Sequence, residues 1–269
     1  MTAIQLGPLI LSTPRFAALL GLLVFLGAAH LLERRGRAGL SDWAWTAALL
    51  VVLGSRIGFV LENLGVYLQE PLTTLYFWQG GFSPLWGFVL ALAYSLWRTP
   101  WRAELLRPMG TLAMLGLATW GGTQLLLTPT DAVPVQRPDT PLQTLAGEPT
   151  DIAAIAAGRP AVLNLWAPWC PPCVRETPMI VGVAASHPET AVVLADQGSS
   201  PAEVEAFLRE RGLSSEDVYL DARARLGPEL KALGLPTTLF FAADGGLAHT
   251  HVGEISRAEL ERRMRLLHE

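Results

Sequence analysis

The chain has 269 residues, a net charge of −4 and a mean hydropathy of +0.33, which is high for a water-soluble protein. The weak negative charge gives no indication of nucleic-acid binding. With only two cysteines, the sequence excludes a small scaffold held together by several disulfides.

The charged residues divide the chain into two unlike halves, since residues 1–130 carry 13 of them and residues 131–269 carry 31. Four apolar stretches in the first half approach the length of about 20 residues that a membrane-spanning helix requires. A cleaved signal peptide is the alternative for the first stretch, but no positive charge precedes Arg15. We therefore predict an α-helical membrane domain over 1–128, with four transmembrane helices at 16–32, 43–61, 82–97 and 109–127.

Arginines between these stretches predict the orientation. Three lie between the first and second stretches and three between the third and fourth, namely Arg34, Arg35, Arg37, Arg98, Arg102 and Arg107. Cytoplasmic loops are enriched in positive charge, so both loops are expected inside and both termini outside. The sequence thus predicts a multi-pass protein of the bacterial inner membrane with its C-terminal domain in the periplasm.

Arg56 falls inside the second predicted span. An ionisable residue within a span is a functional candidate. The interpretation we favour is that its long side chain reaches the outer membrane interface, because Arg56 lies about 20 Å along the helix from Trp43.

The segments RIGFV at 56–60 and WQGGFS at 78–83, followed by Gly87, resemble part of the prolipoprotein diacylglyceryl transferase family. That family has a histidine where this chain has Leu85. The resemblance therefore implies a related scaffold without the transferase chemistry. Because the predicted spans contain no cysteine, we expect this half to anchor the protein or to dock a partner membrane protein.

Residues 129–141 are rich in proline and lack periodicity, which predicts an extended linker before a domain at 142–269. A small hairpin is expected around Ala146 and Gly147. A final helix is expected to begin at Ser256. The remaining pattern predicts strands at 161–166, 191–195, 237–242 and 247–252, and helices from the cysteines to 186, at 202–212 and within 221–234. This order predicts an α/β domain, a mixed sheet with helices on both faces.

Both cysteines lie in the run VLNLWAPWCPPC, which ends at Cys173. The run places Cys170 after a strand and at the start of a helix, where free N–H groups favour its thiolate. Thiols at this spacing form a reversible dithiol/disulfide pair, in which Cys170 attacks a partner and Cys173 resolves the mixed disulfide. Zinc is the alternative for such a pair, but it requires two more ligands. The only close histidine pair, His249 and His251, is expected on an exposed strand face, so we predict no metal.

Three motifs together resemble the TlpA/ResA-like branch of the thioredoxin-fold family, the membrane-tethered thiol–disulfide oxidoreductases. They are the WCPPC run, RETP at 175–178 and GLPTT at 234–238, within a resemblance that covers about 140–268. The resemblance implies a thioredoxin fold and a cis peptide before Pro236, which leaves the backbone beside Cys170 open to a substrate chain. It also implies that Glu176 accepts protons or modulates the pKa of the cysteines. Asn164 stands where thioredoxins proper have a buried acid.

Each of these residues has a plainer alternative. Glu176 could be a solvated helix residue, and Pro236 an ordinary trans turn proline. Trp169 is a further candidate for the site, with a packing role as its alternative.

The resemblance implies a membrane-anchored oxidoreductase that uses the Cys170–Cys173 disulfide and no other cofactor. Its expected partners are periplasmic client proteins with disulfides, such as apocytochrome c or other oxidoreductases, and a membrane electron donor. Reduction is favoured over thiol oxidation or isomerisation. Two other classes remain as alternatives, a lipoprotein-transferase-like membrane protein with an accessory redox domain and a non-enzymatic chaperone.

Overall fold

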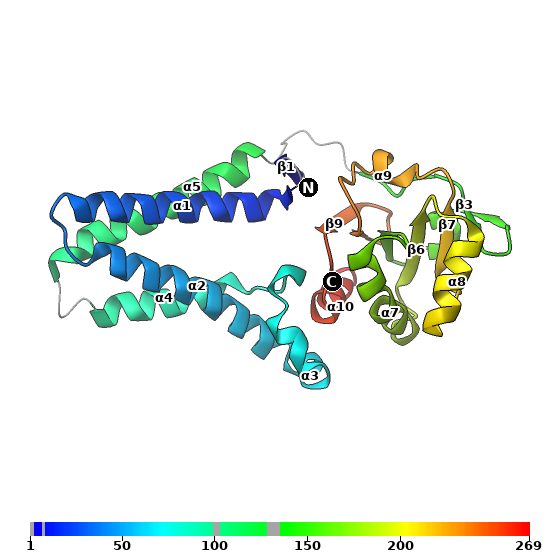
Figure 1. Ribbon diagram of the computed structural model, residues 1–269, viewed down its shortest axis with the longest axis horizontal. Helices are drawn as coiled ribbons and strands as arrows, with labels where there is room; N and C mark the ends of the chain where they lie inside the picture. Colours follow the sequence, from blue (N-terminus) through cyan, green and yellow to red (C-terminus); the bar gives the residue numbers. More distant parts are fainter. Residues whose placement is uncertain (1–2, 7–8, 99–102, 128–134) are drawn as a thin grey trace.

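Long helices form one end of the molecule and a helix-covered sheet forms the other (Figure 1). The computed structural model describes residues 3–6, 9–98, 103–127 and 135–269. Arg102 and residues 129–134 of the predicted linker lie outside these ranges. We call residues 3–127 the helical half and residues 135–269 the sheet domain.

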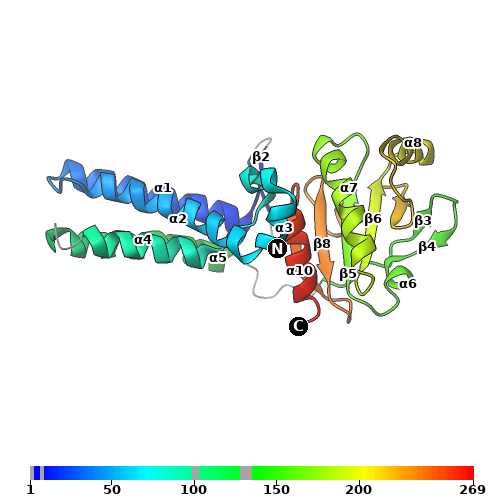
Figure 2. The ribbon, with the colours of Figure 1, turned by 90° about the horizontal axis from the view of Figure 1, so that it is seen from below.

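The helical half is built from two pairs of long helices (Figures 1 and 2). α1 (Thr13–Arg34) lies beside α5 (Leu106–Leu127), and α2 (Leu40–Glu62) lies beside α4 (Pro84–Arg98). Contacts between α1 and α2 join the pairs. Shorter elements complete this half, namely β1 (Ala3–Leu6), β2 (Leu9–Ser12), α3 (Leu64–Gln69), η1 (Pro71–Leu75), η2 (Phe77–Gln79) and η4 (Ala103–Leu105). The four long helices overlap the four predicted apolar stretches.

Glycines allow α2 and α4 to approach closely. A Cβ atom at Gly87 of α4 would collide with the backbone oxygen of Val51 and the hydroxyl of Ser55 on α2. Gly58 of α2 lies directly against the side chain of Trp86. Small residues at such positions are typical of helix pairs that pack by close backbone approach.

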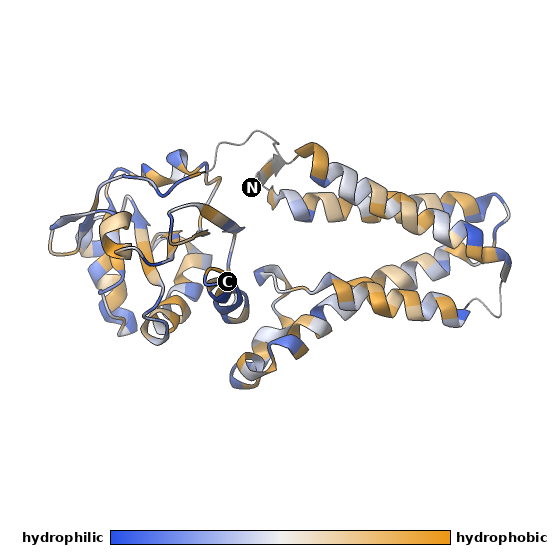
Figure 3. Ribbon diagram, turned by 180° about the vertical axis from the view of Figure 1, so that it is seen from behind, coloured by the Kyte–Doolittle hydropathy of each residue, from blue (hydrophilic) through white to orange (hydrophobic). Residues whose placement is uncertain are grey.

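Two of the described helices, α1 and α2, are long and apolar enough to cross a membrane. α4 has 15 residues, which gives about 22 Å of helix against a hydrocarbon core of about 30 Å. All four long helices expose large apolar side chains, among them Leu23, Leu49, Leu92 and Met114. Figure 3 shows that apolar residues occur along these helices. The helical half therefore contains two candidate spans, and a membrane crossing by α4 and α5 stays a prediction.

The expectation that Arg56 reaches the membrane interface is wrong, because the side chain is buried and only 3% exposed. It donates hydrogen bonds of 2.8 to 3.0 Å to four backbone carbonyls, those of Thr73, Thr74, Gly80 and Gly81. Three aromatic rings surround the guanidinium, those of Tyr67, Phe77 and Phe82. Arg56 therefore fixes the loop at 73–81, since backbone carbonyls satisfy most of its donors.

The sheet domain is organised around β5 (Ala161–Trp166), in the strand order β4-β3-β7-β6-β5-β8-β9. β5 pairs in parallel with β6 (Ala191–Gln197) and antiparallel with β8 (Thr237–Phe241). The remaining strands extend the sheet on both sides, namely β3 (Leu142–Thr144), β4 (Pro149–Thr150), β7 (Val218–Asp221) and β9 (Leu247–Val252). The C-terminal end of the central strand leads directly to the cysteines.

Helices cover both faces of the sheet, as predicted. One face carries α7 (Pro171–Ser186), α8 (Pro201–Arg211) and α10 (Arg257–Leu266), and the other carries α6 (Ile152–Ala156) and α9 (Leu226–Glu229). Val162 and Trp166 join the first core, whereas Leu163 and Leu165 join the second. This alternation explains why β5 is an almost continuous apolar run, because both of its faces are buried.

Most elements expected in this domain are present, including the hairpin of β3 and β4. The sequence analysis missed α6 and β7, which have five and four residues and are too short for a periodic signal. Within the stretch expected as a linker, residues 135–137 lie along the β8–β9 turn. There the backbone N–H of Arg137 donates to the carbonyl of Gly245 at 2.9 Å.

Candidate functional site

The turn after β5 places Cys170 at the N-cap of α7. The backbone N–H of Cys170 donates to the carbonyl of Ala167 at 3.1 Å, which closes the turn. Pro171 and Pro172 occupy the first helical turn, where their missing N–H groups cost nothing. The N–H of Cys173 points back to Sγ of Cys170 at 3.4 Å. Local sequence therefore directs the N–H group of Cys173 at the Cys170 sulfur.

Cys170 and Cys173 form a disulfide at this helix end. Cys173 is fully buried and Cys170 is 4% exposed, whereas the neighbouring Trp169 is 65% exposed. A partner can therefore reach the pair only from the side of Cys170. The large exposed indole of Trp169 is well placed to contact such a partner.

The peptide between Leu235 and Pro236 is cis, as the sequence resemblance implied. Leu235 packs against the core that contains both cysteines. The carbonyl of Pro236 accepts from the N–H of Gly253 at 2.9 Å, which ties this loop to the end of β9.

Glu176 is buried one helical turn after Cys173, which excludes a solvated helix position. Its Oε1 accepts from Nδ2 of Asn164 at 2.9 Å, and its Oε2 accepts from the backbone N–H of Ile255 at 2.8 Å. Burial raises the pKa of Glu176 to about 8, although both hydrogen bonds act in the opposite direction. A carboxyl with this pKa can exchange protons near neutral pH.

Asn164 connects Glu176 to the neighbouring strand. Its Nδ2 also donates to Oγ1 of Thr238 on β8 at 3.0 Å. Its Oδ1 is buried and accepts no hydrogen bond from the residues that the structure describes. Asn164, which stands where the resemblance places a buried acid in thioredoxins proper, therefore holds the carboxyl group of Glu176 by a hydrogen bond.

The sequence analysis did not identify Glu254 as a site residue. This residue is 7% exposed, and its Oε2 accepts from Nη2 of Arg175 at 2.7 Å and from Nε of Arg175 at 3.2 Å. The ion pair raises the pKa of the Arg175 guanidinium. The one signal in the sequence was that Arg175 belongs to the RETP motif. Glu254 itself gave none, because a single acid between a strand and a helix resembles an ordinary loop residue.

The expectation of an exposed histidine face is wrong for His251, which is buried at the end of β9. Burial lowers the pKa of His251 to about 4 and that of His249 to about 3. In the described ranges no group of three or more histidine, cysteine, aspartate or glutamate side chains is placed to hold a metal ion.

Comparison with known families agrees with this geometry. Residues 130–263 match the family model described as Redoxin. The C-terminal half of the chain is a redoxin domain with a thioredoxin fold. The thioredoxin-like protein YneN of Bacillus subtilis is 28% identical over 135 residues, covering 49% of this chain and 78% of the relative. Sporulation thiol-disulfide oxidoreductase A of the same organism is 27% identical over 125 residues, covering 45% of this chain and 74% of the relative. The redoxin domain, as we now call the sheet domain, is accordingly a thiol–disulfide oxidoreductase.

The helical half is similar to a protein of another family. Phosphatidylglycerol–prolipoprotein diacylglyceryl transferase of Thermus thermophilus is 38% identical over 90 residues, covering 30% of this chain and 30% of the transferase. Two residues of the segment that carries the sequence resemblance contact α2, because Oγ of Ser83 and Nε1 of Trp86 both donate to Oε1 of Glu62. Leu85, where the sequence resemblance implies a histidine in the transferases, is exposed. That this half lacks the transferase chemistry stays a prediction.

Proposed function

We propose that this protein is anchored in the bacterial inner membrane and reduces disulfides of periplasmic clients, such as apocytochrome c or other oxidoreductases. The observation that carries the proposal is the Cys170–Cys173 pair at the start of α7, with Glu176 buried one turn behind it. Exchange needs no other cofactor, because the two sulfur atoms carry the electrons.

The reaction begins from the dithiol form. The thiolate of Cys170, stabilised by the helix N-terminus, attacks one sulfur of the client disulfide. The client S–S bond breaks, a mixed disulfide forms, and the other client sulfur leaves as a thiolate. The thiolate of Cys173 then attacks Sγ of Cys170 and releases the second client thiolate. Two electrons pass to the client, and Cys170 and Cys173 end as a disulfide.

Cys173 must lose a proton before it attacks, and we assign Glu176 as the acceptor. The two residues lie three positions apart, on the same face of α7. A pKa of about 8 lets Glu176 take up and release this proton near neutral pH. Rotation of the Asn164 amide would offer its free Oδ1 to the protonated carboxyl.

The arrangement of the helical half supports a periplasmic redoxin domain. The C-terminal ends of α1 and α4 lie far from the redoxin domain (Figure 1), and these ends carry Arg34 and Arg98. Both arginine-rich ends therefore face away from it, as the charge rule for cytoplasmic loops requires. A membrane protein that carries electrons outward would regenerate the dithiol, since the helical half contains no cysteine.

The reduction potential of the full-length protein tests the direction of exchange. The protein in lipid nanodiscs is equilibrated with glutathione buffers, and the oxidised fraction is read from thiol alkylation. A value near about −270 mV supports the reductase, whereas a value near about −120 mV would assign an oxidant.

A further inference from the structure

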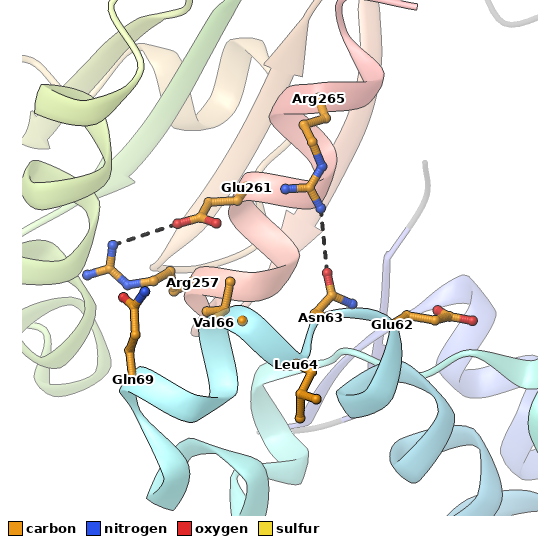
Figure 4. A pocket seen from close by; sticks show the side chains of 9 residues that line it. Glu62, Asn63, Leu64, Val66, Gln69, Arg257, Glu261 and Arg265 are labelled. Atoms are coloured by element: carbon orange, nitrogen blue, oxygen red, sulfur yellow. Dashed lines mark hydrogen bonds and ion pairs between the residues drawn. The ribbon is translucent and has the colours of Figure 1, made fainter.

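The helical half and the redoxin domain meet where α10 lies against α3 (Figure 2). Ala258 of α10 packs with Phe59 and Tyr67 in a small apolar cluster. Polar contacts surround this cluster: Nε of Arg257 lies 2.9 Å from Oε1 of Glu70, and Arg265 contacts Asn63. Figure 4 shows these arginines beside a hollow of about 360 Å³ between α3 and α10. This first contact area lies on the face of α10 that is turned away from the core of the redoxin domain.

A second contact area lies closer to the cysteines. Nε2 of Gln79, on the loop that Arg56 fixes, donates to Oε1 of Glu254 at 2.9 Å. Both side chains are buried. The same loop covers β9, because the Cβ position of Gly80 lies 3.2 Å from the ring of His251. The helical half therefore shields this edge of the redoxin domain from water.

Glu254 uses its two oxygens for two different parts of the molecule. Oε1 binds Gln79 of the helical half, and Oε2 binds Arg175, two residues after Cys173. One carboxylate thus links the loop of the helical half to the helix that carries the cysteines.

The next residues in the chain contact the redox site directly. The N–H of Ile255 binds Oε2 of Glu176, and the N–H of Gly253 binds the carbonyl of Pro236. Any movement of Glu254 therefore displaces donors on both sides of it, because these groups lie one residue away along the backbone.

We propose that Glu254 is a positioning residue that couples docking of the helical half, through Gln79, to the proton exchange of Glu176 at the Cys170–Cys173 site. The inference rests on the proposed function, since it concerns the reactivity of that disulfide. Docking keeps water from Glu254 and Glu176 and holds the Ile255 donor in place. Loss of docking admits water, which favours the ionised form of Glu176.

Few charged groups lie close to Glu176. Arg175 comes from α7 and Glu254 from the turn after β9, and these two charges act on Glu176 in opposite directions. β5 and β8 contribute only the uncharged Asn164 and Thr238. Nε2 of His251 contacts the carbonyl of Glu254, and the loop at 73–81 contributes Gln79. A change in the titration of Glu176 can therefore be traced to this small set.

The experiment uses oxidised full-length protein in lipid nanodiscs. The rate of reduction of the Cys170–Cys173 disulfide by dithiothreitol is measured against pH and corrected for the thiolate fraction of the reagent. The inflection that disappears in Glu176→Gln belongs to Glu176. We expect Gln79→Ala and Glu254→Gln to lower this inflection by about half a pH unit or more, roughly threefold in proton affinity. Glu70→Gln, which removes the ion pair of the first contact area, is the matched control and leaves the inflection in place.

An inflection unchanged in Gln79→Ala, or absent from the unaltered protein, would overturn the inference. An equal shift in Glu70→Gln would also overturn it, because docking would then act without Glu254. Failure of the proposed function is separate, since it appears as an unaltered protein whose dithiol form does not reduce a disulfide-linked model peptide. That reaction is scored in the same preparations.

Discussion

The two halves of this protein treat apolar side chains in opposite ways. In the redoxin domain all six side chains of β5 and all seven of β6 are buried. In the helical half α1 and α5 bury few of their residues, and those of α1 are small, such as Ala17, Gly21 and Ala29. Side chains that face outward in such numbers need an apolar surrounding. The comparison indicates a fold held by its own buried core, attached to a half whose exposed apolar side chains fit the membrane anchor that we propose.

Buried polar groups differ between the halves in the same sense. The buried cation of the helical half, Arg56, is satisfied by backbone carbonyls and holds a loop. One of the buried acids of the redoxin domain, Glu176, has a pKa raised to about 8 and lies one helical turn after a disulfide cysteine. The first arrangement fixes structure, whereas the second is suited to chemistry. Variants that affect one half and spare the other test this division.

The largest effect is expected from Cys170→Ser, which removes the attacking thiol. Disulfide reduction should be lost completely, while membrane insertion of the helical half stays unchanged. Cys173→Ser is the matched control, since it keeps the attack but cannot resolve it and should accumulate a mixed disulfide with the client. Non-reducing gels with a disulfide client measure both. Retained reduction in Cys170→Ser would move the activity out of the redoxin domain.

A second effect is expected in the helical half alone. Gly87→Ala forces a methyl group against Val51 and Ser55, which should cost about 1–3 kcal/mol of stability by overpacking. Gly110→Ala is the control, because no atom lies within 4 Å of its Cβ position and alanine favours a helix by up to about 1 kcal/mol. Thermal unfolding in detergent measures both. Equal stability of the two variants would contradict the close packing of α2 on α4.

Features that depend on neighbouring residues could be predicted from the sequence. Contacts between residues far apart in the chain could not. The apolar strand before Cys170, the helix after it and the proline at 236 lie within short motifs whose geometry is set by adjacent residues. Glu254 acts through Arg175, 79 positions away, and through Gln79, 175 positions away. No periodicity joins such positions. The prediction that His251 is exposed failed for the same reason. The sequence of its strand indicates an exposed face, but α10 and the helical half cover that strand.

A third effect is a pH dependence confined to the redoxin domain. Burial raises the pKa of Glu176 from its ordinary value of 4.5 to about 8. Between these values the folded protein binds a proton that the unfolded chain has lost, so Glu176 contributes a slope in which stability falls as pH rises from 4.5 to 8. His249 and His251, whose pKa values burial lowers, act in the opposite direction below about pH 6.5. The slope that Glu176 contributes is therefore read as the difference between the unaltered protein and Glu176→Gln. Glu176→Gln should remove this slope, whereas substitution of the exposed Glu205 by glutamine should retain it. Chemical unfolding of the oxidised protein at pH 5, 6.5 and 8 measures the slopes. Parallel slopes in all three proteins would mean that Glu176 ionises at its ordinary value.

The smallest effect is expected where the two halves meet at the surface. Glu70→Gln removes the ion pair with Arg257, whose partners are 37% and 24% exposed. A pair in contact with water contributes about 1 kcal/mol or less, because solvent screens the charges. Unfolding of the full-length protein should change by no more than that, and the change should disappear at high salt. Arg257 keeps Glu261 within 3.7 Å, which limits the loss further. A larger, salt-independent loss would mean that the two halves depend on each other for stability. It would contradict a redoxin domain that is held by its own core alone.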